Sequence, residues 1–173
     1  RTLGMIITAG VLISILTLNI MDAQNLRRVS QPYVWSNPVT GLSTTIPAGW
    51  EYEKVAGPDG GTLHAFTNLS TGLLGFFAVE SLPQHTLITY ADALETTLSQ
   101  TMELTEWDRY DLPEVWWMNA TMKEGNHAAS IFLRRVDTRF WRLVYVDQLG
   151  AVSQGIVESP DLTRALFTSI GVE

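Results

Sequence analysis

The feature that most constrains this chain is an uncharged apolar run near its N-terminal end, from Leu3 to Met21. As a helix, these 19 residues would be about 28 Å long, close to the hydrocarbon thickness of a bilayer. A membrane anchor, a cleaved secretory signal and a buried helix of a soluble protein are all compatible with such a run. Because it is longer than the apolar region usual in secretory signals, it predicts a transmembrane anchor over residues 1–22.

One side of the predicted anchor carries a stripe of small side chains, formed by Gly10, Ser14 and Thr17. Small residues let a second transmembrane helix approach closely, so we expect these three to contact integral membrane subunits. The general abundance of small residues in membrane helices is the alternative explanation. Because a short N-terminal tail before such a span usually leads to export of the downstream chain, we expect a cytoplasmic N-terminus. The bulk of the chain would then lie in a bacterial periplasm or an equivalent exported space.

The remaining sequence predicts a linker over residues 23–38 and one α+β domain over residues 39–173. Within the linker, Tyr33–Trp35 could form a short docked strand. Short runs of alternating or apolar residues, separated by turn signals, predict antiparallel strands at about residues 42–46, 50–55, 63–67, 73–79, 108–112, 115–122, 127–136 and 139–146. Apolar residues at helical spacing predict a helix over residues 86–104, and Ser159-Pro160 predicts the start of a closing helix. The expected architecture is an antiparallel sheet covered by helices.

The segment from Gly41 to Trp50, Gly-Leu-Ser-Thr-Thr-Ile-Pro-Ala-Gly-Trp, resembles the opening hairpin of the PsbP-like superfamily. That superfamily includes the extrinsic oxygen-evolving-complex protein of photosystem II and DcrB-like bacterial lipoproteins, and the resemblance covers about residues 38–173. Leu42 stands where family members usually have an aromatic residue, and the lipobox cysteine of the lipoproteins is absent. The resemblance implies an exported domain that serves a larger assembly.

Composition and motifs argue against several classes of function. A net charge of −7 disfavours nucleic acid as a partner, and the absence of cysteine excludes disulfides and thiolate metal sites. His64, His85 and His127 lack the spacing of a local metal motif, although the strands that hold His64 and His127 could bring them together. No phosphate-binding loop or serine-nucleophile motif is present. We therefore expect no enzymatic activity, no cofactor and no metal.

Four arginines lie within nine residues of the expected hairpin, at Arg134, Arg135, Arg139 and Arg142. In paired strands they could form one positive patch for anionic lipid headgroups, a carboxylate-bearing partner or another anion. Ion pairing with Asp137, Asp147 and nearby glutamates is the alternative. The carboxylates at Glu106, Asp108, Asp111 and Glu114 are interpreted as a solvated acidic loop, since they lack the pattern of a calcium-binding loop; a cation site is the alternative.

Six tryptophans are many for this length. Trp50, Trp116 and Trp141 are expected in the core or in hairpin packing. Trp35, Trp107 and Trp117 are expected at the surface, where aromatic residues favour protein interfaces.

Taken together, these features predict a non-catalytic, membrane-anchored accessory subunit that docks onto a larger membrane protein complex, either photosynthetic or of the cell envelope. The alternative is a stand-alone envelope domain that binds a small ligand or lipid.

Overall fold

A computed structural model describes residues 29–57, 60–125, 127–147 and 157–171. The predicted anchor over residues 1–22, with its stripe at Gly10, Ser14 and Thr17, lies outside these ranges. Within them, none of the helices combines the length and the apolar character needed to cross a bilayer.

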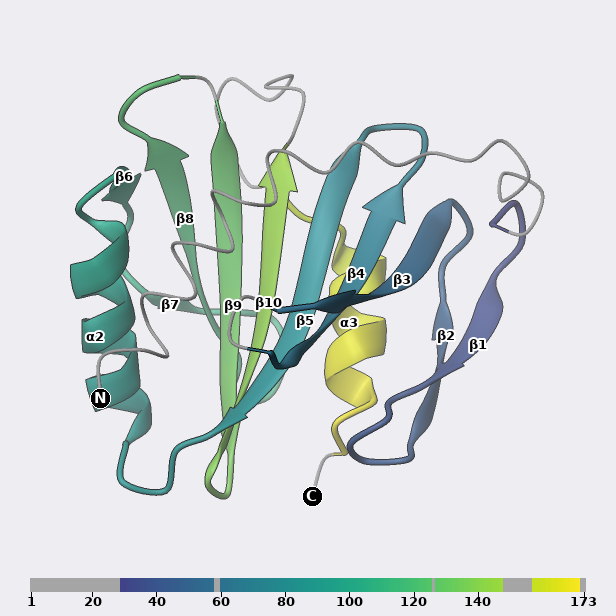
Figure 1. Ribbon diagram of the computed structural model, residues 1–173, viewed down its shortest axis with the longest axis horizontal. Helices are drawn as coiled ribbons and strands as arrows, with labels where there is room; N and C mark the ends of the chain where they lie inside the picture. Colours follow the sequence, from purple (N-terminus) through teal and green to yellow (C-terminus); the bar gives the residue numbers. More distant parts are fainter. Residues whose placement is uncertain (1–28, 58–59, 126, 148–156, 172–173) are drawn as a thin grey trace.

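The described chain is built around an eight-stranded antiparallel sheet in the order β3-β4-β5-β10-β9-β8-β6, with β7 also paired to β8 (Figure 1). A separate hairpin precedes it, and helices α2 (Leu87–Leu98) and α3 (Pro160–Thr168) pack on opposite faces. The hairpin strands are β1 (Tyr33–Ser36) and β2 (Ser43–Ile46), and the sheet strands are β3 (Trp50–Ala56), β4 (Thr62–Asn68), β5 (Leu73–Ser81), β6 (Met102–Leu104), β7 (Asp108–Arg109), β8 (Trp116–Met122), β9 (Ala128–Val136) and β10 (Arg139–Asp147). The expected antiparallel sheet covered by helices is confirmed.

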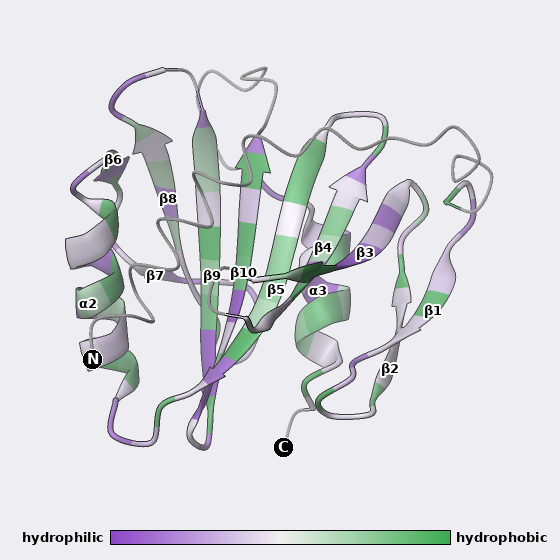
Figure 2. Ribbon diagram, viewed as in Figure 1, coloured by the Kyte–Doolittle hydropathy of each residue, from purple (hydrophilic) through white to green (hydrophobic). Residues whose placement is uncertain are grey.

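Both faces of the central strands are buried, which divides the interior into two cores. The first core lies on the α2 face and contains Leu94, Leu98, Ile131, Leu133 and Phe140. The second core lies on the α3 face and contains Trp35, Phe77, Phe132, Tyr145 and Leu166. Apolar residues dominate one end of β5, β9 and β10, whereas the end near the β9–β10 turn is polar (Figure 2). Helices α2 and α3 each supply an apolar stripe, so the sheet can bury both of its faces along most of its length.

The helix predicted over residues 86–104 is shorter in the structure. Thr86 caps its start, since its hydroxyl accepts a hydrogen bond from Thr89 N, and Ser99 caps its end. Met102 matches the helical spacing of Leu94 and Leu98, but it lies in β6 and is buried in the first core from there. The prediction that the helix extends to residue 104 was wrong, because the strand β6 that follows the helix buries Met102 in the same core.

The hairpin β1–β2 belongs to the core of the domain, although β1 lies within the range predicted as a linker. The Trp35 side chain is 6% exposed and makes edge-to-face contacts with Tyr52, His64 and Phe66 at centroid distances of 5.7, 5.5 and 5.6 Å. On the other side of the hairpin, Thr40 Oγ1 donates a hydrogen bond to Ser169 O at the end of α3 (2.6 Å). The prediction of a surface position for Trp35 is therefore wrong, because the hairpin folds over the second core.

The Pro-Ala-Gly-Trp turn at residues 47–50 joins this hairpin to the main sheet. Gly49 has φ +92°, in the left-handed region that favours glycine, and its amide donates to Val29 O (2.5 Å). This turn delivers Trp50 into the second core, where its ring is 2% exposed and meets the Tyr145 ring edge-on at 6.2 Å. Within the motif, Gly49 thus permits the turn and Trp50 fixes the end of the turn in the second core.

We expect Gly49→Ala to lower the free energy of unfolding by about 1–2 kcal/mol, because a Cβ makes this backbone conformation strained. Urea denaturation measures the change. Gly49→Asn is the matched variant and should cost less, since asparagine tolerates positive φ better than alanine. Equal costs for the two variants would contradict this explanation.

We expect Trp35→Ala to lower the free energy of unfolding by about 3–5 kcal/mol, the usual cost of removing a buried aromatic side chain. The neighbouring Val34 side chain is 71% exposed, so Val34→Ala should change stability by less than about 0.5 kcal/mol. Thermal or urea unfolding of both variants checks this. A small effect of the Trp35 change would place the hairpin away from the core.

Candidate partner-binding surface

The structure places the four arginines on adjacent strands but not in one patch. Phe140 is paired with Arg135 and Trp141 with Arg134, and side chains of neighbouring residues in a strand point to opposite faces. Arg135 and Arg142 consequently lie on the α2 face, whereas Arg134 and Arg139 lie on the α3 face. The prediction of a single positive patch is wrong for this reason, and a binding role for any one of the four stays a prediction.

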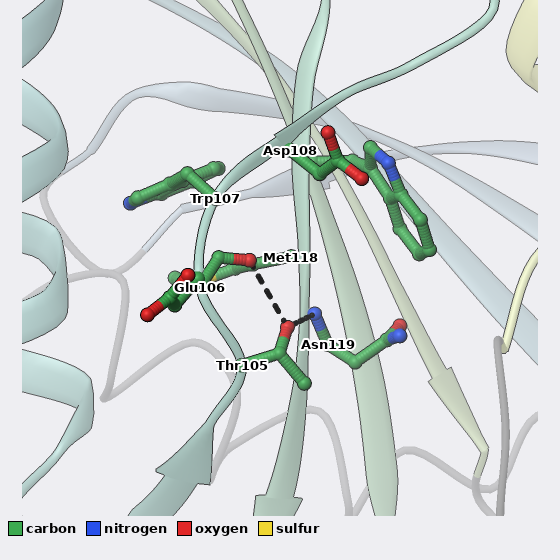
Figure 3. A pocket seen from close by; sticks show the side chains of 7 residues that line it. Thr105, Glu106, Trp107, Asp108, Met118 and Asn119 are labelled. Atoms are coloured by element: carbon green, nitrogen blue, oxygen red, sulfur yellow. Dashed lines mark hydrogen bonds between the residues drawn. The ribbon is translucent and has the colours of Figure 1, made fainter.

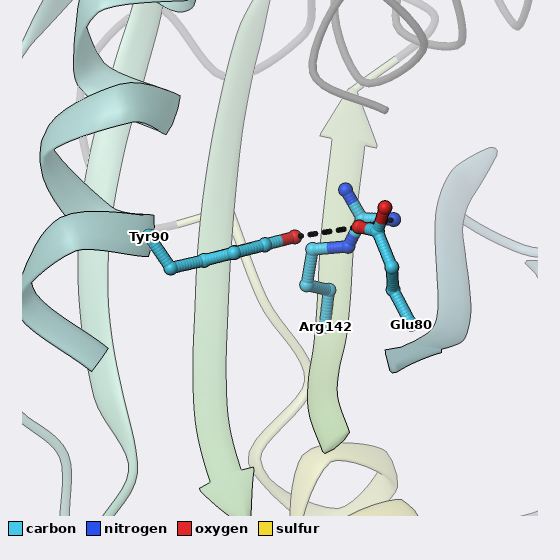
Figure 4. A network of polar contacts seen from close by, with 3 residues as sticks. All are labelled: Glu80, Tyr90 and Arg142. Carbon is cyan, nitrogen blue, oxygen red and sulfur yellow. Dashed lines mark hydrogen bonds and ion pairs between the residues drawn. The ribbon is translucent and has the colours of Figure 1, made fainter. Parts of the chain in front are cut away.

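The arginines on the α2 face contact side chains of the domain itself. Arg142 Nη2 lies 3.7 Å from Glu80 Oε2, and Tyr90 OH donates to the same oxygen at 3.4 Å (Figure 4). The Arg142 guanidinium carbon lies 5.9 Å from the centroid of the Tyr90 ring, and that of Arg135 lies 5.7 Å from the centroid of Phe140. Glu80 is thus an ion-pair partner of Arg142, in line with the alternative of pairing to nearby glutamates. Burial raises the pKa of Tyr90, so its hydroxyl remains a donor at neutral pH.

On the α3 face, the two remaining arginines differ in accessibility. Arg134 is 4% exposed, whereas Arg139 is exposed beside the β9–β10 turn. Arg139 is therefore the member of this pair whose side chain is accessible to another molecule.

Trp107 and Trp117, by contrast, come together at the β8 edge of the sheet. Both are partly buried and line the same open hollow, with a volume of about 610 Å³ (Figure 3). Trp107 packs against the first core and Trp117 against the second, so the hollow straddles the sheet edge. The lining is completed by Thr105, Glu106, Asp108, Met118 and Asn119.

A β-bulge between β6 and β7 creates this hollow. Leu104 is paired with Ala120 and Asp108 with Trp117, so three residues of the outer strand lie opposite two residues of β8. Thr105 holds the start of the bulge, because its amide donates to Asn119 O and its hydroxyl accepts from Asn119 N, both at 2.9 Å. The extra residue turns Glu106 and Trp107 out of the regular ladder.

The hollow is acidic as well as aromatic. The Glu106 and Asp108 side chains are both exposed. A second hollow of about 420 Å³ shares Thr105 and Glu106 and extends to Glu95 and Thr96 on α2. The Trp107 indole nitrogen points away from Asp108 in Figure 3 and has no hydrogen-bond partner among the described residues. The arrangement offers aromatic faces and carboxylate acceptors along one continuous surface.

The histidines do not form a site together. His64 and His127 are separated by β5 and β10, and His64 Nδ1 lies 2.9 Å from Tyr52 OH. Burial, and to a lesser extent the charge of Lys54, lowers the pKa of His64 and favours its neutral form. Among the described residues there is no group of three or more histidine, aspartate and glutamate side chains placed to hold a metal ion.

Sequence reasoning found two of the residues that line the hollow, Trp107 and Trp117, but not their neighbours Thr105, Glu106 and Asn119 as parts of one site. The sequence pattern indicates the carboxylates only as an acidic loop. The available signal is a charged and aromatic stretch, Thr105–Asp108, between two short strands that pair with one partner. Such a stretch is where a bulge can project side chains out of a sheet edge.

No family model and no curated protein sequence matches this chain. Among solved structures, the fold is similar to the solution structure of cyanobacterial PsbP (CyanoP) from Synechocystis sp. PCC 6803. The two chains are 11% identical with a TM-score of 0.48, over 75% of this chain and 85% of that one. At such low identity the similarity has no bearing on what this chain binds.

We expect Glu80→Gln to lower the free energy of unfolding by about 1–3 kcal/mol, because it removes the charge that faces the partly buried Arg142 guanidinium. Glu53 is an exposed carboxylate on β3, and Glu53→Gln should cost less than about 0.5 kcal/mol. Urea denaturation of the two variants makes the comparison. Equal stabilities would show that the ion pair contributes nothing measurable.

Proposed function

We propose that the chain is a non-catalytic accessory protein whose domain docks onto a larger membrane protein complex. The supporting observation is the hollow at the β8 edge, whose lining includes the partly exposed Trp107 and Trp117. Large aromatic residues that remain accessible are typical centres of protein–protein interfaces. The hollow at the β8 edge, rather than the four arginines of β9 and β10, is therefore the proposed docking surface.

In this proposal, the apolar run from Leu3 to Met21 anchors the chain in the membrane, with the N-terminus in the cytoplasm and the domain in the exported space. The small residues Gly10, Ser14 and Thr17 would pack against a transmembrane helix of the complex. An anchor of this kind confines the domain near its partner and raises its effective concentration there. A modest docking surface can then give stable association.

Extraction of the full chain from its native membrane in mild detergent tests this proposal. We expect co-purification with partner subunits at a fixed stoichiometry, and Trp117→Ala should reduce the recovered partner severalfold. Val39→Ala is the control, because Val39 is 42% exposed and lies on the β1–β2 hairpin, away from the hollow. Urea denaturation should first confirm that both variants are folded. A monodisperse monomer after gentle extraction of the native chain would contradict the proposal.

A further inference from the structure

We infer that the hollow at the β8 edge binds an arginine-bearing basic segment of the partner protein. This inference rests on the proposed docking function and deepens it by naming the chemistry of the partner. Its basis is the charge of the hollow, the arrangement of Trp117 and the contacts that the domain already makes within itself.

The surface formed by the two hollows carries an unbalanced negative charge. The described residues that line the two hollows include the carboxylates Glu95, Glu106 and Asp108, and none of them is a lysine or arginine. Within the described part of the chain, neither Glu106 nor Asp108 takes part in an ion pair. Asp108 Oδ1 accepts a hydrogen bond from Arg109 N (2.7 Å). Lys123 Nζ donates to Ser99 O (2.7 Å), at the α2 side of the second hollow, so the unbalanced negative charge is greatest at Glu106 and Asp108. Such a surface favours a positively charged partner.

The Trp117 ring lies beside one of these carboxylates. In the sheet register, Trp117 lies between Phe132 on β9 and Asp108 on β7. One face of the indole stacks on the Phe132 ring, with centroids 6.1 Å apart and planes 15° apart. The register places the opposite face of the indole on the side of Asp108, and the Tyr110 ring meets the indole edge-on at a centroid distance of 6.1 Å. A planar guanidinium can stack on that face and donate paired hydrogen bonds to the carboxylate, which an ammonium group cannot match.

The domain already combines an arginine, an aromatic ring and a carboxylate in its own interior. On the α2 face, Arg142 lies over the Tyr90 ring while its guanidinium faces the Glu80 carboxylate. Trp117 and Asp108 offer the aromatic ring and the carboxylate of such a set, but the described lining of the hollow supplies no arginine. A partner arginine would complete it.

The size of the surface indicates a segment rather than a single ion. A hollow of about 610 Å³ lies within the range of sites that hold a small organic ligand. Because the second hollow shares Thr105 and Glu106 with the first, an extended segment can place one basic side chain beside Asp108 and another beside Glu95.

Peptide binding to the full chain in detergent tests the inference. The probe is a capped peptide of alternating glycine and arginine with three arginines, and the control probe has citrulline, which keeps the shape but lacks the charge. Tryptophan fluorescence and calorimetry measure the affinity. We expect saturable binding of the arginine peptide, weakened by salt, and at least tenfold weaker binding of the citrulline peptide. Equal binding of the two peptides would overturn the inference.

A pair of double variants locates the binding. Glu106→Gln with Asp108→Asn should weaken binding of the arginine peptide at least tenfold. Glu53→Gln with Glu124→Gln removes the same charge from exposed positions outside the hollows and should have little effect. Equal affinities in the two double variants would show non-specific attraction to an acidic protein and would overturn the inference.

The outcomes for the two proposals are separable. If the Glu106→Gln, Asp108→Asn chain still co-purifies with its complex at the native stoichiometry, the inference fails while the proposed function stands. If the native chain binds the arginine peptide through the hollow but is extracted only as a monomer, the chemistry of the hollow stands and the proposed function fails.

Discussion

The register between β9 and β10 is the constraint on which the rest of the structure depends. These two strands have nine residues each and meet at a tight turn, where Asp137 adopts φ +54°. Val136 is paired with Arg139, and from this pair onward each side chain is assigned to one of two faces. A shift by one residue would move Ile131 and Leu133 out of the first core and Phe132 out of the second.

The same register decides which charged groups stay available. It separates the four arginines into two pairs, and Arg135 and Arg142 contact the rings of Phe140 and Tyr90. The guanidinium groups of Arg135 and Arg142, near the β9–β10 turn, therefore already make contacts within the domain. At the β8 edge, the bulge at Thr105–Trp107 has the opposite effect, because it directs acidic and aromatic side chains outward. The asymmetry between the two regions is the reason to expect an acidic docking surface.

Much of the fold follows from local sequence patterns. Alternation and turn signals located most strands, and Ser159-Pro160 marked the start of α3, where the Ser159 hydroxyl accepts from Leu162 N. The end of α2 was missed because Met102 satisfies helical spacing while lying in a strand. The place of Trp35 was missed because its burial depends on Tyr52, His64 and Phe66, which are distant in sequence. The stretch Thr105–Asp108 hints at a bulge, but the hollow itself was missed, since a bulge is defined only by the pairing between strands.

The most direct measurement is site-specific photo-cross-linking of the full chain in its native membrane. A photoreactive side chain at position 96, where Thr96 is exposed beside the shared hollows, is compared with one at position 53 on the opposite edge strand. We expect cross-links from position 96 to one arginine-containing segment of a partner subunit, with far fewer from position 53. Cross-links concentrated at position 53, or cross-links from position 96 only to segments that lack basic residues, would contradict this expectation.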